Sequence, residues 1–509
     1  MSGEQRRRGR NCTLHHAKTA PVARRCVAMA GAVVVWLVLL TGASAATQTH
    51  TVGGAHAAGS GGTWGTAEKV RGLPALNTGG GAAIESVSCP SAGNCAASGS
   101  YQGTSNQEVF VVSETNGVWG KAQELPGIAA LNQDGADIGA VSCASPGNCS
   151  VGGYYGGAAG SFQAFIADET HGTWGKAQEV PGTAALNTGG HADIRSVSCP
   201  SPGSCTAGGY YTNSSGNQAF VVSQTNGTWG KAREVPGTAA LNTGGLADVS
   251  SVSCASPGNC SAGGGYGDIP GKYHLQVFAV SETHGAWGTA KEVPGTAALN
   301  TGGDAAVFSL SCASAGNCAA GGLYADSSEN SLPFVVNQTN GTWGTAEQVP
   351  GTAARYQASY AATESVSCPS AGNCTAGGQF SGRNTTELAF VASQTNGTWG
   401  TAREIPGTVV NPGGDAMTVS VSCPSAGNCG AGGWYYDKTF KQQAFVVSEA
   451  NGTWGTAEEV PGTAALNKEG SAAIAAVSCA TNNHCSAGGY YSYGPARSPI
   501  QQAFTVGAR

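Results

Sequence analysis

Sixteen of the 18 cysteines form eight pairs, and each pair has five residues between its two members. Thiols at this spacing can bind a metal or close a local disulfide. A zinc site needs four converging ligands, and no histidine or second cysteine pair lies at metal-binding spacing beside any pair. The sequence therefore predicts eight disulfides: Cys89–Cys95, Cys143–Cys149, Cys199–Cys205, Cys254–Cys260, Cys312–Cys318, Cys368–Cys374, Cys423–Cys429 and Cys479–Cys485.

Aromatic and arginine side chains gather where one repeated loop departs from its usual pattern. Most copies read Thr-Ala-Ala-Leu-Asn-x-Gly-Gly, but residues 352–360 read Thr-Ala-Ala-Arg-Tyr-Gln-Ala-Ser-Tyr and residues 408–414 read Thr-Val-Val-Asn-Pro-Gly-Gly. Aromatic and arginine side chains supply most binding hot spots, so these loops predict a binding site, with neutral drift as the alternative. The candidate binding residues are Arg355, Tyr356, Tyr360, Arg383, Trp434, Tyr435 and Tyr436.

Three aspartates occupy one repeat position, six residues before the first cysteine of their repeats: Asp137, Asp193 and Asp248. Carboxylates brought together in this way could bind Ca²⁺ through their oxygens. The favoured interpretation is that each accepts hydrogen bonds where a loop meets a strand. No metal and no other cofactor is expected.

Signatures of catalysis are mostly absent. The chain has neither a Gly-x-Ser-x-Gly elbow nor a His-Glu-x-x-His motif. Sialidase-like chemistry needs converging arginines, and the repeat positions of the available ones do not obviously converge: Arg195, Arg233, Arg355, Arg383 and Arg403. Galactose-oxidase-like chemistry needs an unpaired cysteine, whereas every cysteine beyond residue 45 has a partner in its own repeat. Whether the chain is an enzyme stays open, and a non-catalytic role is favoured.

These residues belong to a repeat of 55 to 58 residues that is marked by Trp64, Trp119, Trp174, Trp229, Trp287, Trp343, Trp399 and Trp454. Each unit has four strand-like runs, around Ser-Val-Ser-Cys, Ala-Gly-Gly-Tyr, Ala-Phe-Val-Val and Trp. Asn-Gly between the third and fourth runs predicts a tight hairpin, because both residues tolerate a positive φ. His171 and His284 replace the asparagine as turn residues and are not expected to bind metal.

Four antiparallel strands per unit and a period near 50 predict a β-propeller. The first repeat lacks all but its Trp64 run, while the last stops after its third run at residues 502–506. The N-terminal strand can therefore complete the C-terminal blade and leave no unpaired sheet edge. We predict an all-β, single closed propeller of eight blades over residues 61–509.

The Ala-Gly-Gly-Tyr run and the repeated tryptophan resemble the kelch blade pattern. The Ser-x-Thr-Asn-Gly-x-Trp hairpin resembles the Asp-box of sialidase-type propellers, although it is one residue shorter and lacks the aspartate. Both resemblances imply a secreted type of propeller. Neither implies an activity, because this fold carries many unrelated functions.

The N-terminal segment predicts export. Basic residues in 1–25 precede an apolar run of 14 residues, from Val27 to Leu40, and then Ala43-Ser44-Ala45. This order is typical of a secretory signal peptide (1–45), and 14 residues fall short of the roughly 20 that span a bilayer as an uncleaved anchor. Residues 46–60 predict a flexible leader. Cleavage removes seven of the 24 basic and one of the 30 acidic residues, leaving a net charge of −12, which disfavours nucleic-acid and anionic-membrane binding.

In propellers, the connections between the fourth and first strands and between the second and third strands share one face, which is commonly the binding face. Aromatic pairs lie there, and because adjacent strand residues point to opposite faces, at most one of each pair is expected to be exposed: Tyr154-Tyr155, Tyr210-Tyr211 and Tyr490-Tyr491. Packing between blades and contact with a sugar or protein are both possible roles. The repeated tryptophans are expected to be core residues.

Three functional hypotheses remain. The leading one is a secreted, monomeric, non-catalytic binding module for extracellular glycan or protein, without nucleic-acid partners or membrane insertion after cleavage. The second is a glycoside hydrolase or lyase, with carboxylates such as Glu364 or Asp415 near the mouth of the central channel. The third is a passive surface or scaffold protein.

Overall fold

The computed structural model describes residues 62–353, 360–381, 386–408, 414–495 and 498–508. They belong to one compact unit, Gly59–Arg509. The predicted signal peptide and leader lie outside the described residues, as do Arg355, Tyr356 and Arg383. None of the helices in the described part of the chain is long and apolar enough to cross a membrane.

Each repeat forms one antiparallel sheet, and the third repeat shows the pattern. β12 (Ala192–Ser201) pairs with β13 (Ser204–Asn213), which pairs with β14 (Gly216–Thr225). The fourth strand consists of two dipeptides, β15 (Thr228–Trp229) and β16 (Arg233–Glu234), and both pair with β14. These four strands, called A to D below, confirm the four predicted runs.

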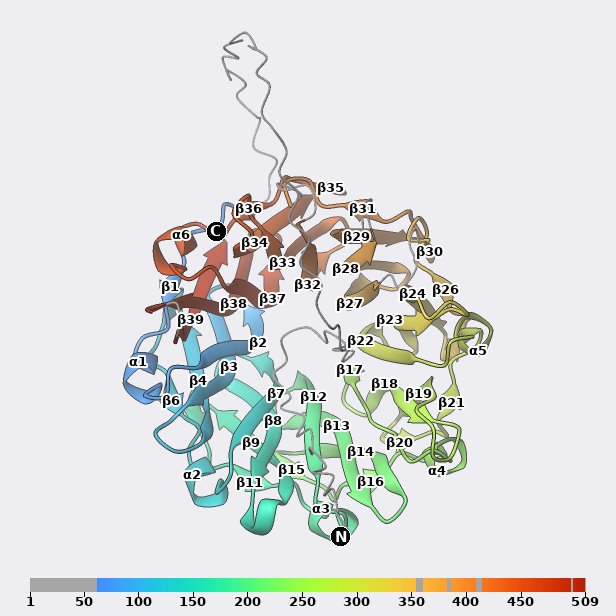
Figure 1. Cartoon of the computed structure of the whole chain (residues 1–509). Coiled ribbons are helices and arrows are strands. Elements are labelled where there is room, and N and C mark those ends of the chain that lie inside the picture. Colours follow the sequence, from blue (N-terminus) through green and yellow to red (C-terminus); the bar gives the residue numbers. More distant parts are fainter. Residues whose placement is uncertain (1–61, 354–359, 382–385, 409–413, 496–497, 509) are drawn as a thin grey trace, which may run out of the picture. The chain divides into compact units, whose positions relative to one another are not determined.

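Eight such sheets surround one axis, so the fold is the predicted all-β, eight-bladed propeller (Figure 1). The A strands of neighbouring blades contact one another around the axis. In blade order the A strands are β2 (Ala82–Ser91), β7 (Ala136–Ser145), β12, β17 (Ser251–Ser256), β22 (Ala305–Ser314), β27 (Ala362–Ser370), β32 (Ala416–Ser425) and β37 (Ala472–Thr481). The B strands are β3 (Asn94–Gln102), β8 (Asn148–Gly156), β13, β18 (Asn259–Gly267), β23 (Asn317–Ala325), β28 (Asn373–Ser381), β33 (Asn428–Tyr436) and β38 (His484–Tyr493).

The outer strands follow the same order. The C strands are β4 (Gln107–Thr115), β9 (Phe162–Thr170), β14, β19 (Leu275–Thr283), β24 (Ser331–Thr339), β29 (Glu387–Thr395), β34 (Gln442–Ala450) and β39 (Ile500–Ala508). The D strands of blades 1 to 7 are β5 (Val118–Trp119) with β6 (Gln123–Glu124), β10 (Thr173–Trp174) with β11 (Gln178–Glu179), β15 with β16, β20 (Ala286–Trp287) with β21 (Lys291–Glu292), β25 (Thr342–Trp343) with β26 (Glu347–Gln348), β30 (Thr398–Trp399) with β31 (Arg403–Glu404), and β35 (Thr453–Trp454) with β36 (Glu458–Glu459).

Short helices punctuate the connections. Six of the eight connections into an A strand hold a four-residue helix: α1 (Leu73–Leu76), α2 (Ile128–Leu131), α3 (Thr183–Leu186), α4 (Thr238–Leu241), α5 (Thr296–Leu299) and α6 (Thr463–Leu466). A 3₁₀ turn, η1 (Ala158–Gly160), lies between β8 and β9. In the connections into blades 6 and 7, the described residues form no helix.

The two ends of the described chain close the ring. β1 (Glu68–Lys69) pairs with β39 as the outer strand of blade 8, and Trp64 pairs with Ala508. The indole nitrogen of Trp64 donates a 3.1 Å hydrogen bond to Ser448 in blade 7. The predicted closure of the C-terminal blade by the N-terminal strand is confirmed.

A ring of serine contacts ties the eight A strands together. The backbone amide of the first cysteine in each repeat donates to a serine hydroxyl of the preceding blade, for example Cys199 to Ser142 at 2.9 Å. The contact recurs at all eight junctions, including Cys89 to Ser478 across the closure. The repeated Ser-Cys sequence thus connects blades as well as forming the disulfides.

Each blade core centres on a fully buried phenylalanine of its C strand, such as Phe220. The paired glycines of strand B allow close packing around it. A Cβ on Gly208 would lie 2.5 Å from Val249 of the next blade, and a Cβ on Gly209 would lie 1.8 Å from the Asp193 carbonyl oxygen. The backbone approach at Gly209 admits only glycine, whereas the first position, which holds Ser98 in blade 1, is closed by a side chain of the next blade.

The predicted turns and covalent links are present. The residue before glycine in seven C–D hairpins has φ between 49° and 51°, including His171 and His284. All eight predicted disulfides are formed, each across the A–B hairpin of its own blade. Disulfides at this density are typical of proteins from an oxidising, extracellular environment.

Candidate ligand-binding face

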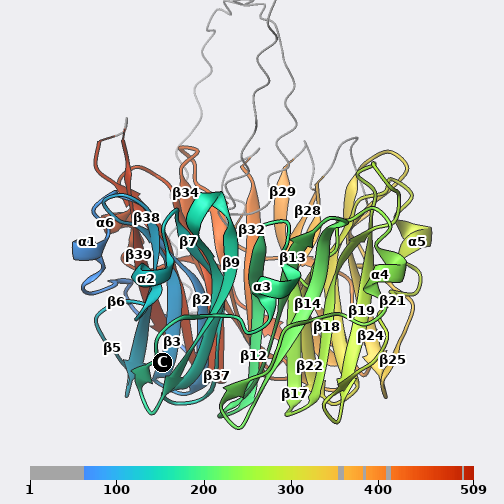
Figure 2. The ribbon, with the colours of Figure 1, turned by 90° about the horizontal axis from the view of Figure 1, so that it is seen from below.

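The D–A and B–C connections lie on one face of the propeller, as expected, and we call this the loop face. In the connection into blade 1, the Gly79 amide donates to the Gln102 carbonyl at the end of β3, over 2.8 Å. On the opposite face, the Gly117 amide of a C–D hairpin donates to Gly93 in the A–B turn, also over 2.8 Å. Figure 2 shows the blades from the side, between these two faces.

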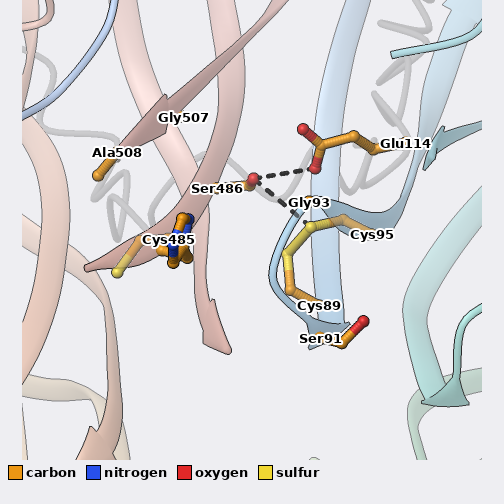
Figure 3. Close-up of a pocket in the computed structure, with 10 residues that line it drawn as sticks. Cys89, Ser91, Gly93, Cys95, Glu114, Cys485, Ser486, Gly507 and Ala508 are labelled. Carbon is orange, nitrogen blue, oxygen red and sulfur yellow. Dashed lines mark hydrogen bonds between the residues drawn. A yellow bond between two sulfur atoms is a disulfide. The ribbon is translucent and has the colours of Figure 1, made fainter. Parts of the chain in front are cut away.

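A small cavity opens near the A–B turns at the junction of blades 8 and 1 (Figure 3). In it, Oγ of Ser486 lies 3.3 Å from a carboxylate oxygen of Glu114 and 3.4 Å from Sγ of Cys95. Gly507 and Ala508 line the cavity at the strand positions that Ser113 and Glu114 occupy in blade 1. Small side chains at the point of closure explain the cavity, and we assign no ligand to it.

The repeated tryptophans pack in the blade cores, as predicted. Trp64, Trp174, Trp229, Trp287 and Trp399 are buried, and Trp119, Trp343 and Trp454 pack against the cores while partly exposed. The Trp229 indole donates to Asp168 of the preceding blade over 3.0 Å, and the Trp399 indole donates to Asn337 over 2.9 Å. Trp64, Trp229 and Trp399 therefore join neighbouring blades as well as packing in the cores.

Most aromatic residues at the ends of the B strands also have structural roles. The Tyr211 hydroxyl donates to Glu234 in the outer strand of its own blade over 3.0 Å. The same contact recurs in three other blades: Tyr101 to Glu124, Tyr155 to Glu179 and Tyr266 to Glu292. In the pairs of blades 2 and 3 the second residue therefore fastens the outer strand, whereas Tyr154 and Tyr210 keep partial exposure. In blade 8, Tyr490 and Tyr491 are both buried.

Four of the predicted binding residues are described by the structure. Tyr435 is only 9% exposed and packs in the core of blade 7. Trp434 and Tyr436, on either side of it, are half-buried, and their ring centroids lie 5.5 Å apart at an interplanar angle of 70°. Tyr360 is half-buried just before β27. Blade 7 thus presents two of its three consecutive aromatic residues.

Acidic residues of three neighbouring blades meet beside Tyr360. Asp304 precedes β22 in blade 5, Glu364 lies near the start of β27 in blade 6, Glu387 begins β29, and Asp415 precedes β32 in blade 7. A and C strands both begin at the loop face. The Glu387 amide donates to Oδ1 of Asp415 over 2.9 Å. We call these four carboxyl groups and the Tyr360 phenol the acid group.

The charges of these side chains influence one another. Burial and the Glu387 carboxylate raise the pKa of Glu364 to about 8. Burial and the Asp415 carboxylate raise the pKa of Glu387 to about 7. Burial, followed by the charges of Glu364, Glu387 and Asp304, raises the pKa of Tyr360 above its ordinary value. Glu364 therefore keeps its proton at neutral pH and can donate a hydrogen bond.

Two polar atoms of the acid group have no partner within the described structure. Oε1 of Glu364 and the phenolic oxygen of Tyr360 are buried without a hydrogen bond. Nearly all buried polar atoms in native proteins are hydrogen-bonded, so each exception calls for a bound water, ion or ligand group. Fifteen further buried side-chain atoms in the described ranges share this state, so the two atoms support a ligand position only together with the surrounding carboxyls and loops.

Asp415 joins the acid group to the aromatic residues of blade 7. Its backbone oxygen accepts a 2.9 Å hydrogen bond from the Tyr436 amide, while its side chain accepts from Glu387. We call the combined surface the blade 6–7 site: Tyr360, Glu364, Glu387, Asp415, Trp434 and Tyr436. It contains Glu364 and Asp415, the two carboxylates suggested from the sequence for a possible hydrolase or lyase. It also contains three of the candidate binding residues.

The three aspartates at one repeat position have other partners. Arg195 contacts Asp248 and lies 3.8 Å from Asp193, and its guanidinium stands 4.9 Å from the centre of the Tyr210 ring. Asp248 also accepts from the Gly265 amide over 3.1 Å, and Asp137 accepts from the Ile138 amide over 3.0 Å. These contacts fit hydrogen-bond acceptors at a loop-to-strand junction. Within the described ranges, no group of three or more His, Cys, Asp or Glu side chains could hold a metal ion.

Sequence reasoning missed Glu387 and Asp304. Glu387 lies on a different strand of the same blade as Glu364, and Asp304 lies in the preceding blade, so only the folded structure relates the three carboxyls. One signal was available, because Asp304 and Asp415 stand at a position that holds Gly81 and Gly135 in blades 1 and 2. The position varies in the other blades, with His191, Leu246 and Ser471, so the two acids on blades 5 and 7 are a weak sign of a site.

Comparisons with known proteins give no family. No protein-family model and no curated protein matches the chain. Among solved structures, the chain is similar to an acylaminoacyl peptidase of Pyrococcus horikoshii (10% identity, TM-score 0.43, 82% of this chain) and spans 59% of that protein's length. It is also similar to Sqt1 from Chaetomium thermophilum (12%, 0.41, 88% of this chain and all of the other).

A third similar structure is the subtype N11 neuraminidase-like protein of A/flat-faced bat/Peru/033/2010 (12% identity, TM-score 0.35, 72% of this chain and 86% of the other). These proteins have different activities. At such TM-scores none of the likenesses bears on what this chain binds or does.

Proposed function

We propose that this protein is an exported binding propeller, with residues 1–45 as its signal peptide, and that it holds an extracellular glycan at the blade 6–7 site. One observation carries the proposal. The two connections that break the repeat, the unpartnered polar atoms of Glu364 and Tyr360, and the half-buried Trp434–Tyr436 pair all occur on neighbouring blades of the loop face.

The chemistry of the site suits a sugar. Pyranose rings offer apolar C–H faces that pack on aromatic rings, and their hydroxyls both donate and accept hydrogen bonds. Trp434 and Tyr436 supply aromatic rings, Asp415 supplies an acceptor, and protonated Glu364 supplies a donor. The monomeric state and the kelch-like or Asp-box-like character of the blades belong to this proposal as well.

A second function is favoured by one specific observation. Glu364 and Glu387 are neighbouring carboxyls whose pKa values are raised to about 8 and about 7. Carboxyl pairs whose protonation is tuned by burial serve as acid and base in glycoside hydrolysis. A hydrolase or lyase acting on the bound glycan, with Glu364 as the acid, is therefore the alternative.

The test uses protein comprising residues 46–509 and a panel of cell-wall and plant polysaccharides. We expect selective binding that Trp434→Ala weakens at least tenfold, while Val118→Ala, which trims a 61% exposed apolar residue at a C–D hairpin of the opposite face, has no effect. Absence of binding by the intact, oxidised protein would overturn the glycan proposal and point to a protein partner. New reducing ends that form with the native protein but not with Glu364→Gln would favour the hydrolase.

A further inference from the structure

Three B–C connections of the loop face share one tight loop. In blades 2, 5 and 7 the amide of the first loop residue donates to the carbonyl four residues later: Gly157 to Ser161 (2.7 Å), Asp326 to Asn330 (3.0 Å) and Asp437 to Lys441 (2.9 Å). The residue before the last has a positive φ in each loop: 73° at Gly160, 61° at Glu329 and 59° at Phe440. Such a loop favours glycine at this position.

Phe440 is an unusual residue for this backbone. Nine non-glycine residues have a positive φ in the described part of the chain, and seven of them are the asparagines and histidines of the repeated hairpins. A bulky side chain in the left-handed region is strained, and such strain persists where the surroundings enforce it, often at functional sites. Phe440 is the only apolar residue among the nine.

The ring of Phe440 gains nothing from the core of the protein. It is 64% exposed, and among the described residues only Val118 and Tyr273 are comparably exposed large apolar side chains. Blade 2 forms the same loop with glycine, so folding of the loop does not require the ring. Neither the backbone nor the packing accounts for a phenylalanine here.

The loop is nonetheless held firmly. One carboxylate oxygen of Asp437 accepts hydrogen bonds from the amides of Thr439 and Lys441, and the other accepts from the Gln443 side chain over 2.8 Å. Burial alone would raise the pKa of Asp437, but the hydrogen bonds from Thr439, Gln443 and Lys441 lower it to about 2. The carboxylate is therefore charged throughout the neutral range, and Phe440 projects from a fixed loop.

Phe440 belongs to the same connection as the aromatic residues of the blade 6–7 site. β33 ends with Trp434, Tyr435 and Tyr436, and the loop Asp437–Lys441 follows directly. We propose that Phe440 is a further ligand-binding residue, which stacks on the flat C–H face of a pyranose ring next to the unit held at Trp434 and Tyr436. This inference rests on the proposed glycan function and extends the ligand to at least two sugar units of a β-linked polysaccharide, in which equatorial substituents leave that face open.

The test compares Phe440→Gly, Phe440→Tyr and the matched control Glu329→Gly in the equivalent loop of blade 5. Each variant of residues 46–509 is titrated with a mixed-linkage β-glucan, a β-glucomannan and chitin oligomers, and its melting temperature is recorded. Phe440→Gly should weaken binding at least tenfold without lowering the melting temperature, because it relieves the strain. Phe440→Tyr should bind within about threefold of the native protein, and Glu329→Gly should leave binding unchanged.

The outcomes separate the two proposals. If Phe440→Gly binds a glycan as tightly as the native protein does, Phe440 has no role in binding, and the proposed function remains intact. A clear fall in the melting temperature of Phe440→Gly would show that the ring serves the fold, which also overturns the inference. Native protein that binds none of the three probes, nor any other glycan of the panel, would overturn the proposed function and this inference together.

Discussion

The backbone amide of Glu387 in blade 6 donates a 2.9 Å hydrogen bond to the side chain of Asp415 in blade 7. Because the carbonyl of Asp415 also accepts from the Tyr436 amide, the contact fixes the acid group relative to the aromatic end of β33. A single residue thus sets the geometry of a surface built from two blades. Its position just before an A strand places this surface beside the propeller axis on the loop face.

The acid group predicts a stability that falls as the pH rises. In the unfolded chain a glutamate loses its proton near pH 4.3, whereas in the folded protein Glu364 and Glu387 keep theirs to about pH 8 and 7. Between these pH values the folded state binds more protons than the unfolded state does. The free energy of unfolding therefore decreases from about pH 4.3 until the two glutamates ionise in the folded protein.

The melting temperature measured from pH 6 to 9 checks this prediction. Glu364→Gln keeps the shape of the side chain without a titrating proton, so its melting temperature should fall less over this range than that of the native protein. Equal slopes for the two proteins would contradict the raised pKa of Glu364. Glu68→Gln, a change at an exposed residue of β1, serves as the control.

The architecture could be predicted from the sequence because its determinants repeat. The cysteine spacing, the Asn-Gly hairpins and the N-terminal Trp64 run each specify a local structure, and eight copies make the interpretation safe. The roles of Ser142 and its equivalents could not be predicted, since their partners are amides of the next blade. Contacts between repeats follow from the curvature of the ring, which no single repeat encodes.

The candidate site was only partly predictable for the same reason. Broken loop patterns drew attention to Tyr360 and to the end of β33, but Glu387, on another strand of blade 6, and Asp304, in blade 5, are related to them only by the folded structure. Strand parity did not decide which member of the triplet is buried, and the structure places Tyr435 inside. Phe440 has an ordinary sequence context, and its strained backbone becomes visible only in three dimensions.

Closure of the ring predicts a sharp effect of N-terminal truncation. A chain that begins at residue 72 lacks Trp64 and β1, so the outer edge of β39 loses its partners. An unpaired strand edge recruits other strands, and we expect a lower melting temperature together with self-association in sedimentation experiments. A chain that begins at residue 62 should behave as the longer protein does. Equal stability and a monomeric state for both truncations would show that β1 is dispensable.

The Arg195 cluster predicts that one substitution lowers the free energy of unfolding and that a second substitution restores much of it. Arg195→Met leaves Asp193 and Asp248 facing each other without the guanidinium that separates them. Removing one partner of a mostly buried ionic group costs about 3 kcal/mol of unfolding free energy. Urea denaturation should show this loss, and adding Asp248→Asn should recover a good part of it. If Arg195→Met alone is as stable as the native protein, solvent must screen the charges of the two carboxylates from each other.

The disulfides predict that stability is distributed evenly around the ring. Each bond links cysteines six positions apart within one hairpin, and a loop this short contributes about 2 kcal/mol in the chain-entropy view. Replacing Cys199 and Cys205 together by serine should therefore lower the free energy of unfolding by about that amount and leave the fold intact. The equivalent change at Cys423 and Cys429 should cost the same, because both pairs occupy one repeat position.

Full reduction is a different case. Eight such contributions exceed the 5–15 kcal/mol by which most proteins are stable, so the reduced chain should unfold. Circular dichroism at increasing concentrations of reductant follows the loss of structure. Free thiols counted in parallel give the number of disulfides that have opened. Gradual loss of structure as successive pairs open would indicate independent blades, whereas an abrupt loss after the first few would indicate that closure makes the ring one cooperative unit. A fully reduced protein that keeps its melting temperature would show that the serine contacts and blade cores suffice.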